Sequence, residues 1–457
     1  MTTTTNRSAT SPAVAAALAL LEAGIEADIA AHAAPGLSIA VVGDGTTLLA
    51  RGFGHADLDR RVPATAGTVY AIGSITKLFT ATMLMRLRDA GKLRLDDPVQ
   101  DHLPEARIPR RHAGSPDITL RHLVTHTSGL TKDAPAEYWA TGDFPPIETL
   151  LALMPETEQP YPPATRWKYS NLAIALLGHA LERIAGEPWD TYVAREILTP
   201  LGMAGTAPRL AAHQRAALAT GYARPVAGWP PAVLPHQDLG AISYGGSMHA
   251  TVADMALFVL DQLSPAPRVL ARSSVLEMQR LQWLNDDWRS GQGIGWRVHR
   301  AGDGSTRIEH GGGVFGFTCK LLMSPADGLG VAVFTNGSDG NVGIGWAARA
   351  LDILAPVFRA RTPAVAPAAS AAPASWQGFV GRYRWVLGDM EIFVRGGELL
   401  MLAPAPPGEV EVRLVPEGEA SFRMLGGSVH GETLRFVAGP DGRIVRAWVG
   451  PHPHARL

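Results

Sequence analysis

A stretch with no charge and no periodicity, residues 362–375, most constrains how this chain can fold. It reads TPAVAPAASAAPAS, and such an Ala- and Pro-rich run is typical of a semi-extended linker rather than of a packed element. It therefore predicts two folding units, residues 12–361 and residues 376–457. The chain has 457 residues, 46% of them hydrophobic, which is enough apolar material for two cores.

The first unit mixes helical and strand patterns, which predicts an α/β (α+β) domain. Residues 37–42 and 47–50 are β-rich runs on either side of an Asp-Gly turn, the pattern of a hairpin. Residues 71–90 are apolar on more than one face and are followed by a glycine, as expected of a central buried helix. Strand patterns return between residues 294 and 336.

The second unit contains short alternating runs separated by Gly and Pro turns. Runs of this length at regular spacing predict a small sheet or a β-barrel-like domain.

Charge and cysteine content exclude several classes of function. Lys and Arg total 41 and Asp and Glu total 42, so the formal net charge is -1, whereas a nucleic-acid binder normally shows a basic face. Cys319 is the single cysteine, so the fold does not depend on an intramolecular disulfide. No run approaches the ~20 apolar residues of a membrane span. The apolar run at residues 13–21 continues into Glu22 and Glu26, which indicates an amphipathic helix rather than a leader. We therefore expect a cytoplasmic protein.

Ser74 and Lys77 form the first candidate catalytic pair. A spacing of three places both side chains on one helical face, and a serine hydroxyl needs an adjacent base to become a nucleophile. The tetrapeptide Ser-x-x-Lys is common by chance. Lys77, however, is the only base between Arg61 and Arg86, inside an apolar segment, which argues against an ordinary surface lysine.

Two further candidate elements lie later in the chain. Tyr169 can shuttle a proton, and Asn171 can hold Lys77 or a substrate carbonyl, although Asn171 is equally suited to cap the helix that follows. His310 precedes three glycines, whose unobstructed N–H groups make Gly313 a candidate oxyanion-hole partner for the N–H of Ser74.

The order Ser-x-x-Lys, Tyr-x-Asn and His-Gly-Gly resembles the serine β-lactamase and penicillin-binding-protein-like family, and within it the class C-like branch. Residues 70–77, 118–130, 169–178 and 310–317 are similar to the same family. The resemblance implies a β-lactamase/transpeptidase-like domain in which helices flank an antiparallel sheet. The tail from residue 379 onward resembles the lipocalin-like module of some members.

The resemblance also implies roles for individual residues. Ser74 matches the acylated nucleophile, Lys77 its base, Tyr169 the proton shuttle and Asn171 the polar group beside it. His310 stands where β-lactamases of this type carry the lysine of Lys-Thr-Gly. Because a histidine is only partly protonated near neutrality, this departure predicts an esterase, peptidase or transacylase rather than an efficient β-lactamase.

Remaining candidates concern the substrate and metals. Trp296 and Phe315 are candidate substrate-binding residues, and a core role is equally compatible with each. His122 and His126 have a zinc-compatible spacing but no glutamate between them. We therefore expect neither a metal nor a cofactor.

Three functions follow from these residues and from the resemblance. The first is hydrolysis of an ester or amide in a small molecule or peptide, through an acyl-enzyme on Ser74. The second is a thioesterase or peptide cyclase that acts on carrier-bound peptides, for which Arg446 in the tail is a candidate for binding a substrate carboxylate. The third is a non-catalytic binding protein on the same fold. Neither nucleic acid nor a membrane is an expected partner.

Overall fold

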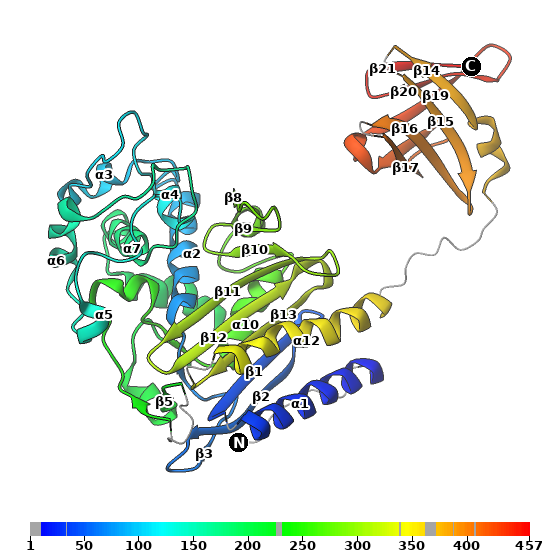
Figure 1. The fold of residues 1–457 in the computed structure, drawn as a ribbon. Helices are drawn as coiled ribbons and strands as arrows, with labels where there is room; N and C mark the ends of the chain where they lie inside the picture. Colours follow the sequence, from blue (N-terminus) through cyan, green and yellow to red (C-terminus); the bar gives the residue numbers. More distant parts are fainter. Residues whose placement is uncertain are drawn as a thin grey trace. The chain divides into compact units, whose positions relative to one another are not determined.

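The computed structural model describes residues 11–32, 34–224, 231–337, 340–361, 372–386, 388–405 and 408–457. It divides the chain into two compact units, Met1–Arg359 and Ala360–Leu457 (Figure 1). Most of the predicted linker, residues 362–371, lies outside the described residues. In the described part of the chain, no helix is long and apolar enough to cross a membrane.

An antiparallel sheet of nine strands organises the first unit, which confirms the predicted fold class. Its strand order is β3-β2-β1-β13-β12-β11-β10-β9-β8. The predicted hairpin is β1 and β2, where Gly43 pairs with Thr46 and the two turn residues between them have positive φ angles. The strands are β1 Gly36–Gly43, β2 Thr46–Asp57, β3 Val62–Pro63, β8 Trp283–Leu284, β9 Ser290–Gln292, β10 Arg297–Arg300, β11 Thr306–Val314, β12 Phe317–Ser324 and β13 Leu329–Thr335.

Helices cover both faces of this sheet, and two separate apolar clusters result. The first and last helices of the unit pack on one face, and Figure 1 shows them side by side there. The central helix and most of the others pack on the opposite face. The helices are α1 Pro12–His32, α2 Thr76–Asp89, α3 Val99–His102, α4 Leu120–Val124, α5 Tyr138–Thr141, α6 Ile147–Ala152, α7 Asn171–Ala185, α8 Trp189–Val193, α9 Thr199–Leu201, α10 Val252–Leu263, α11 Arg272–Gln279 and α12 Gly340–Arg361.

The central helix α2 is shorter than the sequence predicts, because a tight turn precedes it. Tyr70–Ala71 is a short strand, β4, and Gly73–Ile75 forms one turn of 3-10 helix, η2. Gly73 requires this turn, since its φ of +51° suits a residue without a Cβ. Ser74 therefore lies in the turn before α2 rather than inside the helix.

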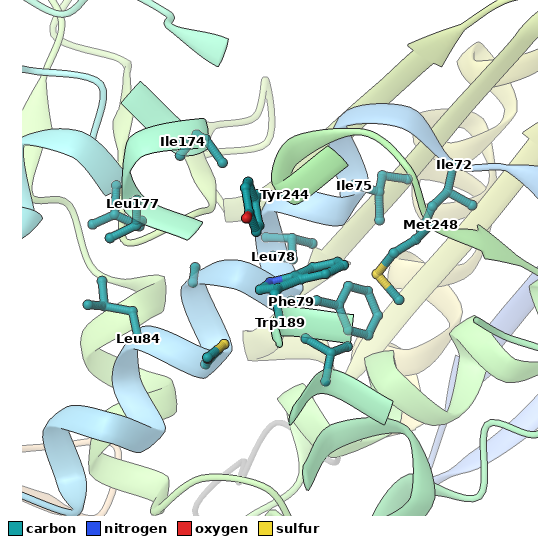
Figure 2. Packing of buried hydrophobic residues seen from close by; sticks show 14 of the residues in the cluster. Ile72, Ile75, Leu78, Phe79, Leu84, Ile174, Leu177, Trp189, Tyr244 and Met248 are labelled. Atoms are coloured by element: carbon teal, nitrogen blue, oxygen red, sulfur yellow. The ribbon is translucent and has the colours of Figure 1, made fainter. Parts of the chain in front are cut away.

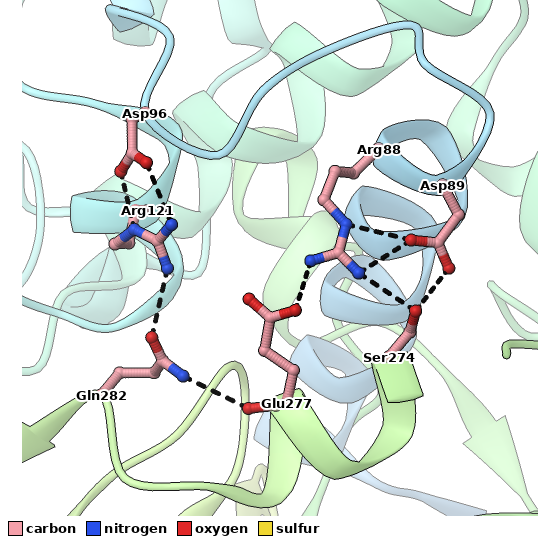
Figure 3. Close-up of polar contacts among 7 residues, drawn as sticks. All are labelled: Arg88, Asp89, Asp96, Arg121, Ser274, Glu277 and Gln282. Carbon is pink, nitrogen blue, oxygen red and sulfur yellow. Dashed lines mark hydrogen bonds and ion pairs between the residues drawn. The ribbon is translucent and has the colours of Figure 1, made fainter. Parts of the chain in front are cut away.

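The far end of α2 is tied to α11 by charged side chains (Figure 3). Arg88 bonds to Glu277 and to Ser274, and Ser274 in turn donates to Asp89 at 2.6 Å. These contacts leave α2 little freedom to move along its axis, which helps to fix the turn at its other end.

The second unit is a closed antiparallel barrel of eight strands, which confirms the predicted barrel-like domain. A 3-10 helix, η9 (Ala374–Gly378), leads into it. Inward-facing side chains form one apolar cluster of their own. The strands are β14 Gly381–Trp385, β15 Gly388–Arg395, β16 Glu398–Ala405, β17 Gly408–Pro416, β18 Ser421–Leu425, β19 Thr433–Ala438, β20 Ile444–Val449 and β21 His452–Arg456.

Candidate active site

Ser74 is held at the edge of the core by buried neighbours on each side. Ile72, Ile75 and Leu78 have no exposed surface, and they pack among Phe79 and Met248 (Figure 2). Ser74 itself is only partly buried, so its hydroxyl stays accessible. Apolar packing thus fixes the backbone of the turn, and Ser74 is the residue of the turn that remains partly exposed.

The hydroxyl of Ser74 meets both predicted partners. Lys77 Nζ lies 3.1 Å from Ser74 Oγ, and Tyr169 Oη lies 2.8 Å from the same atom. Lys77 is 2% exposed, and its Nζ also donates to the backbone oxygen of Gly245 at 2.9 Å. The three side chains form one hydrogen-bonded group in which a proton can pass between the serine and either partner.

His310 is buried and uncharged. Burial, followed by the nearby positive charge of Lys77, lowers its pKa to about 3. Its Nδ1 lies 2.7 Å from the backbone oxygen of Gly311, and a carbonyl can only accept, so Nδ1 carries the proton and Nε2 is the acceptor. His310 therefore adds no positive charge near neutral pH, where a lysine would.

The glycines after His310 allow strand β11 to lie directly against the turn that carries Ser74. A Cβ on Gly312 would stand 2.0 Å from the backbone oxygen of Ile72, and one on Gly73 would stand 2.8 Å from Gly313 N. The N–H of Ser74 is in the first turn of a helical segment, where such groups lack a partner within the helix. Gly73, the residue before Ser74, therefore lies directly against the backbone of Gly313.

His126, which the sequence presents only as a possible metal ligand, contacts the segment of Tyr169. Its backbone oxygen accepts from Lys168 N at 2.8 Å, and its Nδ1 accepts from Ser170 N at 3.3 Å. The rings of His126 and Tyr169 are 4.5 Å apart between centroids. His126 therefore holds the residue on each side of Tyr169 and packs against Tyr169 itself.

The backbone and charge state of His126 fit this role. Its φ of 59° is uncommon for a residue with a side chain. Burial, then the charge of Lys77, holds the pKa of His126 well below its ordinary range, so the ring is neutral and Nδ1 is free to accept. The sequence offers one signal for His126, because it lies within residues 118–130, which resemble the serine β-lactamase and penicillin-binding-protein-like family.

Asn171 differs from its predicted role. Its amide donates to Asp133 Oδ1 at 3.1 Å, and among the described residues no hydrogen bond joins it to Ser74 or Lys77. It is not the helix cap either, because the side chain of Ser170 caps α7 by accepting from Ala173 N. Asn171 therefore braces the loop that contains Asp133.

The prediction that Trp296 lines a substrate cleft is wrong. Trp296 has no exposed surface, and its ring stacks on Phe258 inside the core. Phe315, in contrast, is half-buried at the β11–β12 turn and lines a hollow of about 330 Å³ together with Val314 and Ser247. It also lies against Trp139, so it forms part of an aromatic wall.

The other candidates are placed as follows. Arg446 is an exposed residue of β20 in the barrel. His122 closes a capping box with Thr119, whereas His126 lies beyond the end of α4, so the two do not share a helical face. Among the described residues, no group of three or more His, Cys, Asp or Glu side chains could hold a metal ion. Cys319 is buried, as expected of a core thiol.

Arg297, which was not a candidate from the sequence, carries a positive charge near His126 and His310. It is exposed on β10, and its guanidinium carbon lies 5.4 Å from the centre of the Trp167 ring. Its charge contributes to the lowered pKa of both His126 and His310.

Comparisons with known proteins agree with this fold. A family model for β-lactamases matches residues 21–354. Penicillin-binding protein 4 of Amycolatopsis lactamdurans is 31% identical over 320 residues, which is 67% of this chain and 82% of that protein. Protein flp of Staphylococcus aureus is 24% identical over 68% of this chain, which spans only 61% of the length of that protein.

Two solved structures share the fold of nearly the whole chain. The octameric penicillin-binding protein homologue from Pyrococcus abyssi aligns with a TM-score of 0.64 at 24% identity, covering 96% of this chain and 100% of its own. SurE aligns with a TM-score of 0.61 at 24% identity, covering 97% and 100%. With the family model matching residues 21–354, these findings show that the chain belongs to the β-lactamase and penicillin-binding-protein-like family, whose members are generally serine hydrolases.

Proposed function

We propose that this protein hydrolyses an ester or amide through an acyl-enzyme on Ser74. The observation that carries the proposal is the pair of contacts on Ser74 Oγ, from a buried Lys77 Nζ at 3.1 Å and from Tyr169 Oη at 2.8 Å. A partly exposed serine whose Oγ lies within hydrogen-bond distance of a lysine and a tyrosine has the arrangement of a nucleophile beside its acid–base groups.

The proposed reaction begins when Lys77 as the neutral amine, or Tyr169 as the phenolate, takes the proton of Ser74. The alkoxide attacks the carbonyl carbon, and the N–H groups of Ser74 and Gly313 stabilise the oxyanion. Tyr169 then returns a proton to the leaving group, and neutral His310 can accept a hydrogen bond at Nε2 in this step. Water attacks the acyl carbon and gives a proton to Tyr169, and the base that first deprotonated Ser74 returns a proton to its Oγ as the acid leaves.

The charge distribution supports an ester or peptide rather than a β-lactam as the preferred substrate. His310 is neutral near pH 7, because its pKa is about 3, so it cannot pair with a carboxylate as a lysine would. Arg297 is the exposed cation nearby, and we expect it to favour substrates whose anionic group lies farther from the scissile bond.

The test is acylation and turnover of p-nitrophenyl butyrate. Wild-type protein should gain the mass of a butyryl group on the peptide that contains Ser74, and Ser74→Ala should show neither adduct nor turnover. Tyr169→Phe and Lys77→Met should lower kcat by about 100-fold or more, since general acid–base groups contribute ~10²–10⁴-fold. The matched controls are Tyr161→Phe and Lys92→Met, which change exposed residues of the same types.

Turnover that survives in Ser74→Ala would overturn the proposal. A second substrate tests whether the acyl group of the acyl-enzyme is transferred to water or to an amine. It is a peptide thioester that ends in D-alanine and carries an internal amine. A Ser74-dependent cyclic product would assign the chain to the cyclase alternative, whereas the free acid would support hydrolysis.

A further inference from the structure

The barrel of the second unit is filled at one end and hollow at the other. At the filled end, Phe379 stacks on Phe436 with centroids 4.4 Å apart, and Phe422 packs edge-on against both. The opposite end, where β14 meets β15 and β20 meets β21, encloses a cavity of about 320 Å³. Small-molecule sites are typically ~300–1,000 Å³, so the hollow is large enough for a ligand.

The walls of this cavity suit an aromatic guest. Met390, Met401, Val412 and Val449 line it and belong to the apolar cluster of the barrel. Methionine sulfur makes favourable contacts with aromatic rings and adapts to irregular shapes. At the rim, the ring of Trp385 lies 5.6 Å from that of His454, which offers a stacking surface.

The polar groups of the cavity provide an acceptor but no unpaired charge. Among the described residues that line the cavity, Asp389 is the only one with a permanent charge, and Arg384 donates to both of its carboxylate oxygens at 2.9 Å. His454 is 8% exposed, and its Nδ1 lies 3.1 Å from the backbone oxygen of His452. Nδ1 therefore carries the proton, which leaves Nε2 as a hydrogen-bond acceptor.

We propose that the barrel cavity is a binding site for an uncharged aromatic molecule with one N–H or O–H donor. The apolar walls and sulfur atoms bind the ring, and His454 Nε2 accepts from the donor. The ion pair between Asp389 and Arg384 leaves no free charge to balance an ionic ligand. All the residues that line this cavity belong to the second unit, and the proposal does not depend on the hydrolase activity.

Calorimetric titration of the full chain with indole tests the site. Indole should bind saturably below ~1 mM, the weak end of specific affinity. Its analogue 1-methylindole has the same rings without the N–H donor, so it should bind about fivefold to tenfold more weakly, because an acceptor is left unpaired. This comparison requires no mutation and so does not depend on how well a variant folds.

Two variants on one strand then locate the site. Val449→Phe fills the cavity from inside and should weaken indole binding at least tenfold. Val445→Phe adds the same group to an exposed position of β20 and should leave binding unchanged. The proposal is wrong if indole does not bind, if Val449→Phe in a folded chain binds it as tightly as the wild type, or if 1-methylindole binds equally well. Unchanged binding in Ser74→Ala would confirm that the site is independent of the acyl-enzyme.

Discussion

At the scale of single residues, the candidate site consists of a reactive group and the residues that aim it. Ser74, Lys77 and Tyr169 contact one another directly. His126 instead accepts hydrogen bonds from the backbone N–H groups of Lys168 and Ser170, on either side of Tyr169. We therefore regard His126 as a positioning residue.

The role of His126 can be tested with two substitutions. His126→Leu removes the acceptor for Ser170 N and places at a φ of 59° a residue that adopts the left-handed region less readily than His. His126→Asn keeps a side-chain acceptor and tolerates that backbone. We expect His126→Leu to lower kcat about 10- to 100-fold with little change in KM, because a small misplacement of a catalytic group has such effects. The Asn variant should recover most of the rate.

The measurement is steady-state kinetics with p-nitrophenyl butyrate, paired with thermal unfolding of each variant. If His126 only stabilised the fold, the loss of rate would follow the fraction of unfolded protein. A wild-type kcat in a fully folded His126→Leu would contradict the positioning role.

At the scale of elements, the site depends on how closely strand β11 approaches the turn before α2. Gly312 lies opposite the backbone oxygen of Ile72, and an added Cβ would stand 2.0 Å from it. Neither backbone can yield easily, because β11 pairs with β12 and the turn is packed in the core.

Gly312→Ala should therefore push the strand and the turn apart and separate the N–H groups of Gly313 and Ser74. We expect kcat to fall at least about 100-fold, the effect of losing one oxyanion donor. Gly302→Ala is the control, since a Cβ there meets no atom within 4 Å. Burst kinetics with the p-nitrophenyl ester would report acylation directly, and an unchanged burst rate in Gly312→Ala would refute this account of the oxyanion pair.

At the scale of the whole molecule, the chain contains two separate cores that differ in the kinds of side chain they bury. The first unit buries several uncharged histidines, and the second is an apolar barrel. In the first unit, burial lowers the pKa of His310 to about 3 and that of His249 to about 4, from an ordinary 6.5.

These shifts predict how stability changes with pH. Below pH 6.5 the unfolded chain binds more protons at these histidines than the folded chain does. Their contribution to the free energy of unfolding is therefore complete above pH 6.5 and is lost progressively as the pH falls toward 4. Each group contributes a slope of up to about 1.4 kcal/mol per pH unit. In urea unfolding at pH 7.5, 6.0 and 5.0, His249→Phe should lose less stability on acidification than the wild type, whereas His213→Phe, at an exposed position, should match it. Equal losses in all three proteins would show that His249 does not titrate as described.

The features that the sequence determined by itself are local. The spacing of Ser74 and Lys77, the Asp-Gly hairpin and the alternating runs of the barrel each depend on residues a few positions apart, where backbone geometry alone decides which side chains share a face. Tyr169 and His310 were candidates by residue type alone, and the resemblance to a family joined them to Ser74 and Lys77, which periodicity could not have done.

Only the tertiary structure decided which distant residues meet. Tyr169 reaches Ser74 across 95 positions of chain. His126 packs against Tyr169 with a left-handed backbone that no local pattern specifies. Trp296 is buried in the core, whereas Phe315 lines the hollow beside Ser247, although both are aromatic residues beside glycines. Burial of this kind depends on packing summed over many contacts from several elements, so it is a property of the folded chain and not of any segment.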